Sequence, residues 1–248
     1  MCYDDAAHPP PPPGASGQAS TENLVLTASD SNRFAAYAAH PVHPARAQII
    51  ILPDAGGLRQ FYKELTLRFA QVGIEALAFD YFGRSAGLAA RDDSFEWQQH
   101  VPHLKLEMFF ADLTAALACL RATGTGERAT FAIGFCMGGT FSFWSGTTDI
   151  GLSGAIGFYP HVDNQLLSEV VEQIKVPVLG LFGEADQFVP VSEVRVFDEK
   201  LDDFNIEHQV VIYPGVPHGF FELQQTAEYA DDGWKRVLDF ITTHTPAN

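Results

Sequence analysis

The chain reads Thr130-Phe131-Ala132-Ile133-Gly134-Phe135-Cys136-Met137-Gly138-Gly139 at its most informative point. The first four residues form a mostly apolar run that is typical of a strand buried on both faces, and residues 140–144 fit a helix. Between them, glycines flank Cys136 in the pattern of a nucleophile elbow, a tight turn that lifts its central side chain above the sheet. The segment therefore predicts a strand, a sharp turn and a helix, with a thiol at the turn.

A thiol at the start of a helix is a candidate nucleophile. The unpaired N–H groups and the dipole of the helix favour an anion there, which lowers the pKa of a cysteine and can also stabilise an oxyanion. The alternative is an inert buried cysteine, but the glycine spacing and the strand-to-helix context favour a function for Cys136. The other two cysteines, Cys2 in the N-terminal tail and Cys119 on the apolar side of a helix, are interpreted as inert.

Strand and helix patterns alternate on both sides of the elbow. Residues 24–27 and 34–37 predict an antiparallel hairpin, because the residues between them favour a turn. The remaining elements are strands predicted at 48–52, 76–79, 130–133, 155–158, 178–182 and 209–212, and helices predicted at 61–72, 106–120, 192–204 and 234–241. This order predicts an α/β fold: a mostly parallel sheet with an antiparallel N-terminal edge and helices on both faces. Chemistry in such sheets lies beyond the carboxyl ends of the strands.

Composition separates an N-terminal leader from the rest of the chain. Residues 1–22 contain five consecutive prolines, Pro9 to Pro13, followed by glycine and serine, and this predicts a disordered, extended leader outside the fold. Residues 23–248 are predicted to form a single domain. Within this domain, residues 85–102 fit neither the helix nor the strand period. They are interpreted as a long loop or small cap over the carboxyl edge of the sheet.

Charge and hydropathy exclude several classes of protein. The chain has 15 Lys and Arg against 31 Asp and Glu, a formal charge of −16, so an unaided nucleic-acid binder is not expected. No apolar run approaches the roughly 18 residues of a membrane span. The acidic residues 1–5 lack the basic region of a secretory signal, so a cytoplasmic location is predicted.

A nucleophilic thiol needs a base and a third group that orients the base. Asp186 follows the predicted strand at 178–182, and His218 follows the strand at 209–212. In elbow enzymes the acid and then the histidine come after the nucleophile in the chain, which is the order found here. The carboxyl ends of parallel strands can therefore bring Cys136, Asp186 and His218 together.

Other residues compete for these roles. Glu184 lies in the same loop as Asp186 and is a rival orienting acid, although Asp186 is favoured because it follows the sharp turn at Gly183. Among the other histidines, three could reach the same edge and are possible substrate contacts: His100, His103 and His161.

These motifs together resemble those of the dienelactone hydrolase family over residues 24–243. The motifs are Gly134-Phe135-Cys136-Met137-Gly138-Gly139, Gly183-Glu184-Ala185-Asp186 and Pro217-His218-Gly219-Phe220. The resemblance implies an α/β-hydrolase fold and a Cys136, His218 and Asp186 triad that cleaves a lactone or ester without metal or organic cofactor. It also implies an oxyanion hole formed by the backbone N–H groups of Met137 and Ala55.

The resemblance implies three further substrate-binding positions. Asp54 occupies the place where the family usually has a glutamate beside the cysteine, and Arg84 is a candidate for one of two arginines that hold a substrate carboxylate. The second arginine is expected four residues after the catalytic histidine, where this chain has Glu222. A carboxylate there would repel an anionic substrate, so dienelactone itself is not the expected substrate.

The expected function is hydrolysis of a small lactone or carboxylic ester through a thioester intermediate, by a monomer or weak homodimer that binds neither nucleic acid nor membrane. Two alternatives stay open. The fold could serve as a ligand-binding or sensing protein without turnover, or as a thiol amidase. The acidic surface favours neutral substrates over anionic ones.

Overall fold

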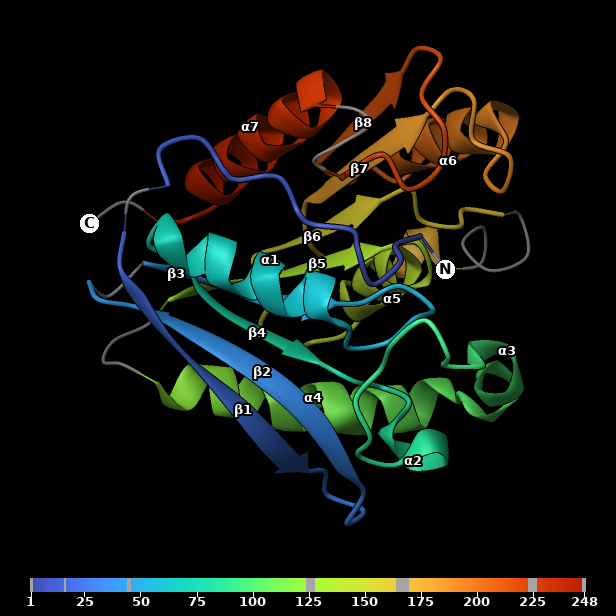
Figure 1. The fold of residues 1–248 in the computed structure, drawn as a ribbon. Coiled ribbons are helices and arrows are strands. Elements are labelled where there is room, and N and C mark those ends of the chain that lie inside the picture. The colour runs from blue at the N-terminus through green and yellow to red at the C-terminus, as the bar shows by residue number, and fades with distance from the viewer. Residues whose placement is uncertain are drawn as a thin grey trace.

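A single eight-stranded sheet lies at the centre of the molecule (Figure 1), in the order β1-β2-β4-β3-β5-β6-β7-β8. The computed structural model describes residues 2–15, 17–43, 46–123, 128–163, 170–222 and 227–246. The strands are β1 (Ala19–Thr27), β2 (Arg33–Pro41), β3 (Ala47–Leu52), β4 (Glu75–Phe79), β5 (Ala129–Phe135), β6 (Gly154–Phe158), β7 (Val178–Gly183) and β8 (His208–Tyr213).

The helices cover both faces of the sheet (Figure 1). The α-helices are α1 (Gln60–Gln71), α2 (Gly83–Ala86), α3 (Trp97–His100), α4 (Leu106–Ala122), α5 (Met137–Ser145), α6 (Val191–Asp203) and α7 (Ala227–Thr243). Two short 3₁₀ segments, Val101–His103 and Val171–Gln173, complete the described elements. None of the helices in the described ranges is both long and apolar enough to cross a membrane.

The pairing of the strands confirms the predicted fold class. β1 pairs with β2, and β2 with β4, in antiparallel register, whereas the pairs from β4 through β3, β5, β6 and β7 to β8 are all parallel. The hairpin predicted at residues 24–27 and 34–37 is longer than expected, since β1 begins at Ala19 inside the predicted leader. Backbone pairing with β2 extends it past the apolar stretch that the sequence pattern detects.

β3 shows how the sheet is buried on both faces. Ile49 and Ile51 pack among the side chains of α1 and α7, whereas Ile50 points to the opposite face and packs against α4. All three isoleucines are fully buried. Burial of each such side chain contributes about 1.5–3 kcal/mol, which explains why the strand reads as a continuous apolar run rather than an alternating one.

The N-terminal leader lies against the body of the protein, which corrects the prediction that residues 1–22 are disordered and solvated. In Figure 1 the dark blue leader crosses the molecule between α1 and α7. Tyr3 is buried, its ring stacks on Phe61 of α1 at 3.8 Å, and the indole N–H of Trp234 on α7 donates to the carbonyl of Pro10 at 2.9 Å. The prolines do keep the backbone extended, but they also supply apolar surface that the two helices cover.

Residues 85–102 form a mixture of loop and short helix. α2 lies at the start of this stretch and α3 at its end, and the chain between them has no regular structure. The interpretation as a long loop or small cap therefore agrees with the structure, because Trp97 and Val101 at its C-terminal end form part of a cavity wall beside Cys136. The single-domain assignment of residues 23–248 stays a prediction.

Candidate active site

Cys136 lies at the turn between β5 and α5. It is the N-terminal cap of α5 and has φ 53° and ψ −118°, a backbone conformation that non-glycine residues rarely adopt. A Cβ atom at Gly134 would lie 1.9 Å from the carbonyl oxygen of Gly138, and a Cβ atom at Gly138 would lie 2.2 Å from that of Leu52. Only glycine fits at these two positions, and the predicted strand, sharp turn and helix are confirmed.

His218 and Asp186 meet at the same edge of the sheet. The ring of His218 bonds through Nδ1 to Oδ2 of Asp186 at 2.6 Å, and the other oxygen of Asp186 accepts the backbone N–H groups of Phe188 at 2.8 Å and Val189 at 3.1 Å. These bonds hold the carboxylate in place and leave Nε2 of the imidazole available to the Cys136 thiol. The rival acid Glu184 is exposed and instead accepts the backbone N–H of Gly215 at 2.9 Å.

Two histidines surround the Cys136 thiol. Its Sγ lies 3.8 Å from Nε2 of His161. The thiol also hydrogen-bonds to His218. The pKa of Cys136 is held well below its ordinary value, chiefly by hydrogen bonding from the neighbouring Cys2 thiol and then by the two histidines, against the opposing effect of burial. These interactions favour the thiolate form of Cys136 over the thiol.

The pKa of His218 moves in the opposite direction. Burial lowers it, but hydrogen bonds to Asp186 and to Cys136 outweigh this effect and raise the pKa to about 9. The pKa of His161 is also raised, mainly by its hydrogen bond to Cys136. Both shifts favour a thiolate and imidazolium pair of Cys136 and His218, and the helix dipole at the start of α5 adds to the stabilisation of the thiolate.

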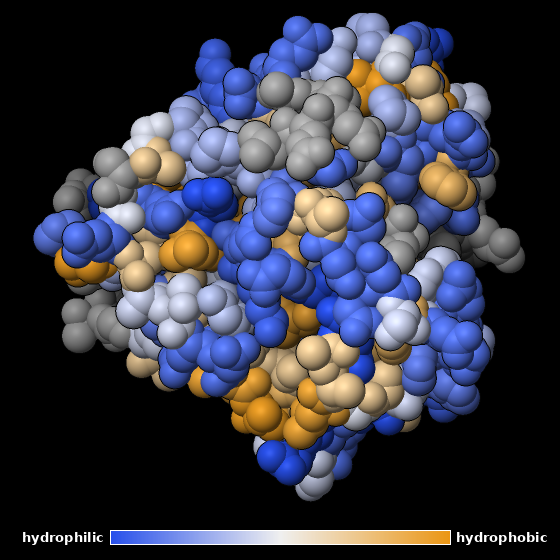
Figure 2. Space-filling model, in the orientation of Figure 1, coloured by the Kyte–Doolittle hydropathy of each residue, from blue (hydrophilic) through white to orange (hydrophobic). Residues whose placement is uncertain are grey.

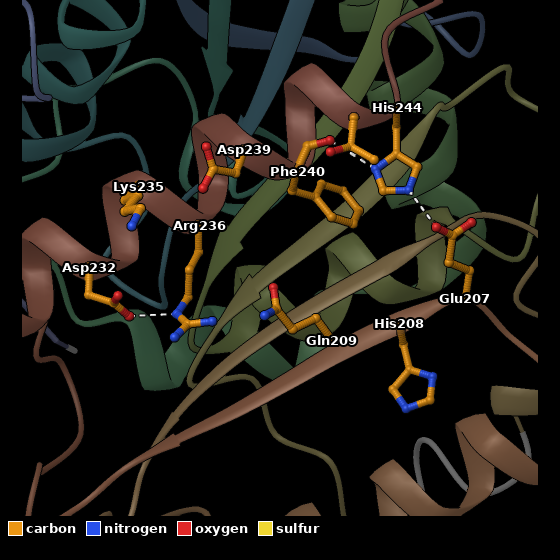
Figure 3. Close-up of a pocket in the computed structure, with 10 residues that line it drawn as sticks. Glu207, His208, Gln209, Asp232, Lys235, Arg236, Asp239, Phe240 and His244 are labelled. Carbon is orange, nitrogen blue, oxygen red and sulfur yellow. Dashed lines mark hydrogen bonds and ion pairs between the residues drawn. The ribbon is translucent and has the colours of Figure 1, made fainter.

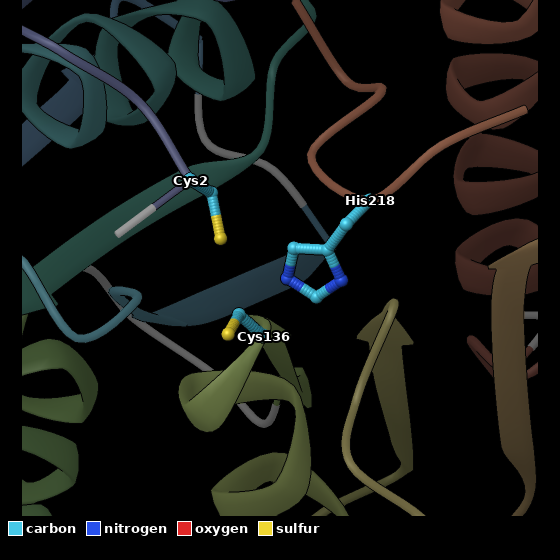
Figure 4. A group of neighbouring side chains, drawn as sticks. All are labelled: Cys2, Cys136 and His218. Atoms are coloured by element: carbon cyan, nitrogen blue, oxygen red, sulfur yellow. The ribbon is translucent and has the colours of Figure 1, made fainter. Parts of the chain in front are cut away.

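Cys2 is the residue near Cys136 that the sequence interpretation missed. The donor atoms of Cys2, Cys136 and His218 all lie within 4.8 Å of one another, the only such group of metal-ligand types among the described residues (Figure 4). Cys2 is half-buried, and burial is the main cause that raises the pKa of its thiol. No sequence pattern around Cys2 indicates that it lies near Cys136, because the proline-rich leader has no periodicity that predicts its packing. Only the tertiary structure shows this contact.

The loop after β3 lies next to the thiols. The carboxylate of Asp54 is fully buried and accepts the backbone N–H of Cys2 at 2.5 Å and that of Gly56 at 2.7 Å. Burial raises its pKa, and the bond from Cys2 opposes that rise. Asp54 therefore holds the leader as well as its own loop. Ala55, the next residue, lines the same cavity as Met137 at the start of α5.

A cavity of about 600 Å³ opens onto the thiol and His218. Its wall is mainly apolar and aromatic, with contributions from the segment before α4, from α5 and from the loop after β7. The apolar lining residues are Trp97, Val101, Leu104, Leu106, Phe141, Trp144 and Phe188. The two charged side chains that line it, Lys105 and Asp163, have opposite signs. The lining is more apolar than the outer surface of the protein in Figure 2, where hydrophilic residues predominate.

Arg84 does not line this cavity, which corrects its prediction as a substrate-binding arginine. Its guanidinium bonds to both oxygens of Asp112, at 3.0 and 2.8 Å, and to Asp30 at 2.5 Å. The Asp112 carboxylate is almost completely buried, so the arginine is needed there to balance its charge. The sequence predicted that Arg84 lies in the substrate cleft because it follows a strand end. In the structure its ion pair with Asp112 holds the side chain outside the cavity that contains Cys136.

Glu222 also lies away from the cavity described above. It is half-buried near the leader, where burial and the neighbouring Asp4 raise its pKa and His8 lowers it. The other two candidate histidines do not reach the thiol either: His100 bonds to Ser85 at 3.0 Å, and His103 lines a separate cavity with Arg84. His161 is the one of the three that the structure brings to Cys136.

A second cavity, of about 370 Å³, lies at the other end of β8 (Figure 3). Two pairs of its side chains bond to each other: His244 bonds to Glu207 at 3.1 Å, and Arg236 bonds to Asp232 at 2.5 Å. The cavity also lies at the amino end of a parallel strand, where chemistry is not expected.

Comparisons with known proteins agree with this geometry. The model of the dienelactone hydrolase family matches residues 34–245. A protein of Methylorubrum extorquens, provisionally named carboxymethylenebutenolidase, is 28% identical over 208 residues, which cover 78% of this chain and 70% of that protein.

Two solved structures have the same fold. One, from Klebsiella pneumoniae subsp. pneumoniae and provisionally named dienelactone hydrolase, has a TM-score of 0.80 at 21% identity and covers 91% of this chain and 99% of its own. The other, a dienelactone hydrolase-like promiscuous phosphotriesterase from metagenomic libraries, has a TM-score of 0.79 at 19% identity and covers 93% of this chain and 100% of its own. Since the family model matches most of the chain, this protein belongs to the dienelactone hydrolase family and is a hydrolase with the α/β-hydrolase fold.

Proposed function

We propose that this protein hydrolyses small neutral carboxylic esters or lactones through a triad of Cys136, His218 and Asp186. The observation that supports this most strongly is the arrangement at the elbow. A thiol at the start of α5 lies beside a histidine that Asp186 holds at 2.6 Å, and both face a cavity large enough for a small ester. The named relatives include carboxymethylenebutenolidases and a lactonase, which supports a lactone as the substrate class.

The first half of the reaction forms a thioester. The Cys136 thiolate attacks the ester carbonyl, and the backbone N–H groups of Met137 and Ala55 stabilise the negative charge that develops on its oxygen. His218, already protonated in the resting pair, donates its proton to the alkoxide as the C–O bond breaks. For a lactone, the released alcohol stays attached to the acyl group. The side chain of Asp186 keeps the imidazole in the orientation that this transfer needs.

The second half releases the acid. A water molecule attacks the thioester while neutral His218 takes one of its protons, and the same N–H groups stabilise the second oxyanion. The C–S bond then breaks, the acid leaves, and the thiolate and imidazolium pair returns. The low pKa of Cys136 makes the thiolate a good leaving group, which favours this step.

The lining of the cavity supports neutral substrates. Its wall is apolar, and its two charged side chains, Lys105 and Asp163, have opposite signs. A substrate carboxylate would need a bidentate arginine, and the one predicted for this role, Arg84, is held by Asp112. A compact apolar acyl group with an activated alcohol therefore fits better than an anionic dienelactone.

The substitution Cys136→Ala tests the proposal. We expect turnover of p-nitrophenyl butyrate to fall at least ~10³-fold, because the N–H groups alone cannot replace the nucleophile. Cys119→Ser is the matched control and should keep wild-type turnover, since Cys119 lies on α4. Intact mass spectrometry of quenched wild type should show a butyryl adduct on Cys136. Undiminished hydrolysis by Cys136→Ala would rule out the triad.

A further inference from the structure

The hydrolytic cycle uses one thiol, but the active site contains two. Cys2 and Cys136 have their sulfur atoms within 4.8 Å of each other and of a His218 ring nitrogen (Figure 4). In the picture the Cys2 side chain points toward Cys136, and the His218 ring lies beside both. Ester hydrolysis needs only one nucleophilic thiol, so the second thiol beside it is open to a further role.

Several contacts of the leader hold Cys2 in this position. Its backbone N–H donates to the buried Asp54 carboxylate at 2.5 Å. The next residue, Tyr3, stacks on Phe61 at 3.8 Å and accepts a hydrogen bond at its carbonyl from Arg59 at 2.5 Å. The Tyr3 hydroxyl also contacts that of Tyr159. These contacts involve three different parts of the fold, namely the loop after β3, the start of α1 and the residue after β6, so the tertiary structure positions the second thiol.

The two sulfur atoms differ in their chemistry. Cys136 is at a helix N-terminus and has two histidines as neighbours, which favours the thiolate and hence reaction with electrophilic oxygen. Cys2 has no histidine contact of this kind except His218, which also lies next to Cys136. One reactive, low-pKa cysteine next to a second thiol is the arrangement in which a sulfenic acid is resolved to a disulfide.

We propose that Cys136 and Cys2 form a peroxide-reactive pair, in which a hydroperoxide oxidises Cys136 and Cys2 resolves the product to an intramolecular disulfide. This activity uses the active-site thiol but does not depend on which ester the protein hydrolyses. The co-substrate is a small hydroperoxide, ROOH, which reaches the thiol through the cavity of about 600 Å³.

The chemistry balances in two steps. The Cys136 thiolate attacks the terminal peroxide oxygen, the O–O bond breaks, and the RO⁻ that leaves takes the proton of His218, giving Cys136–SOH and ROH. The Cys2 thiol then loses its proton to His218 and attacks the sulfur of Cys136. The S–S bond forms, the S–O bond breaks, and the hydroxide that leaves takes the same proton as water. The two thiols are oxidised, and the peroxide is reduced to ROH and water.

The structure allows the two sulfur atoms to meet. A disulfide needs an S–S distance of about 2.05 Å, so the sulfurs must approach by at most about 3 Å. Rotation of a side chain about its Cα–Cβ bond supplies a shift of this order, and Cys2 belongs to a leader segment outside the sheet. Oxidation would cover the nucleophile and stop hydrolysis, and reduction by a dithiol would restore it.

The test is peroxide treatment of the full chain with any affinity tag at the C-terminus. Wild type, Cys2→Ser and Cys119→Ser are treated with hydrogen peroxide in the presence of a chelator, and intact masses are measured without reductant. We expect wild type and Cys119→Ser to lose two hydrogens, with one cross-linked peptide that contains Cys2 and Cys136. We expect Cys2→Ser to gain oxygen at Cys136 instead, with sulfinate formation at least ~10-fold faster than in wild type.

Two further measurements separate this proposal from the proposed hydrolase. Dimedone, which captures sulfenic acid, should label Cys136 strongly in Cys2→Ser and weakly in wild type, whether or not any ester is hydrolysed. Dithiothreitol should remove the cross-link from wild type but should not reverse the sulfinate of Cys2→Ser. Identical oxidation products in wild type and Cys2→Ser, or cross-links that join Cys119 or two chains, would overturn the proposal.

Discussion

Cys136 and His218 share one proton, and the neighbours of each residue decide where it lies. Cys2 and His161 lower the pKa of the thiol, while Asp186 and the thiolate raise the pKa of His218 to about 9. The ordinary values would leave the proton on sulfur, since a free cysteine has a higher pKa than a free histidine. In this site the two shifts favour the reverse order, with the proton on His218 and a negative charge on the candidate nucleophile.

This reversal predicts the pH dependence of acylation. The reactive pair needs deprotonated Cys136 and protonated His218, so kcat/KM should stay level through neutral pH and fall as the pH rises through about 9, where His218 loses its proton. Asp186→Asn removes the bond that raises the pKa of His218, and the alkaline limb should move to lower pH. Turnover should also fall by ~10² or more.

The matched control is Glu184→Gln, because Glu184 is in the same loop but bonds to Gly215. It should keep the wild-type profile, measured as kcat/KM for p-nitrophenyl butyrate across pH. An alkaline limb that is unmoved in Asp186→Asn would contradict the assigned role of Asp186.

Arg84 is a second residue whose role the structure changes. Because it neutralises the buried Asp112, Arg84→Ala should lower the free energy of unfolding by about 3 kcal/mol while KM for a carboxylate-bearing ester stays within ~2-fold of wild type. Urea unfolding and steady-state kinetics check the two outcomes. The exposed Arg195 on α6 is the control, and Arg195→Ala should leave both quantities unchanged. A large rise in KM without loss of stability would instead support the prediction that Arg84 binds the substrate carboxylate.

At the scale of secondary-structure elements, close backbone contact between β3, β5 and α5 makes the elbow possible. α5 begins directly after the turn, and its first residues pass so close to β3 that a side chain at Gly138 has no room. This contact brings the start of α5, with its free N–H groups, beside the loop that contains Ala55. The proposed oxyanion site therefore depends on two elements rather than on one residue.

Gly138→Ala tests this contact. The added Cβ would lie 2.2 Å from the carbonyl oxygens of both Leu52 and Pro53. These are backbone atoms, and moving them would disturb β3 and the loop that follows it. We expect the free energy of unfolding to fall by more than ~4 kcal/mol, measured by urea denaturation, or the protein not to fold. Gly14→Ala is the control, because no atom lies within 4 Å of the added Cβ, and the positive φ of Gly14 should cost only ~1 kcal/mol. If Gly138→Ala were as stable as wild type, the backbone of α5 would not pack as closely against Leu52 and Pro53 as described.

At the scale of the whole molecule, the charge of −16 acts on any charged substrate before it reaches the cavity. The charged side chains of the cavity wall outside the Cys136, His161 and His218 cluster are Lys105 and Asp163, which have opposite signs, and among the described residues no arginine lines the cavity to offset the surface. Anions should therefore be repelled at low ionic strength, and salt should weaken this repulsion. The predicted cytoplasmic location and the predicted monomer or weak dimer stay predictions.

A matched pair of esters tests this effect. We expect kcat/KM for 4-acetoxybenzoate to be at least ~10-fold below that for phenyl acetate at about 10 mM salt, and to rise several-fold by about 300 mM, where the Debye length is short. The value for neutral phenyl acetate should stay level over the same range and serves as the control. An anionic ester that is preferred at low salt and weakened by added salt would indicate a local cationic site instead.

The alternation of strands and helices along the chain, the elbow and the places of Asp186 and His218 after their strands could all be predicted from the sequence. Each depends on a local signal: an apolar run marks a buried strand, glycines around Cys136 mark the sharp turn, and a polar residue after a parallel strand must lie at the carboxyl edge of the sheet. Because parallel strands place their ends together, local signals were enough to assemble the candidate triad.

The partners of Cys2, Asp54 and Arg84 were decided only by the tertiary structure. Cys2 bonds to Asp54 across 52 positions and Arg84 bonds to Asp112 across 28, and neither pair has a repeating pattern that links its members. Periodicity reports which face of an element is buried, but it does not report which distant loop or leader covers that face. The candidate nucleophile could thus be predicted from the sequence, whereas the position of the second thiol beside it depends on the packing of the leader against the apolar side chains of α1 and α7.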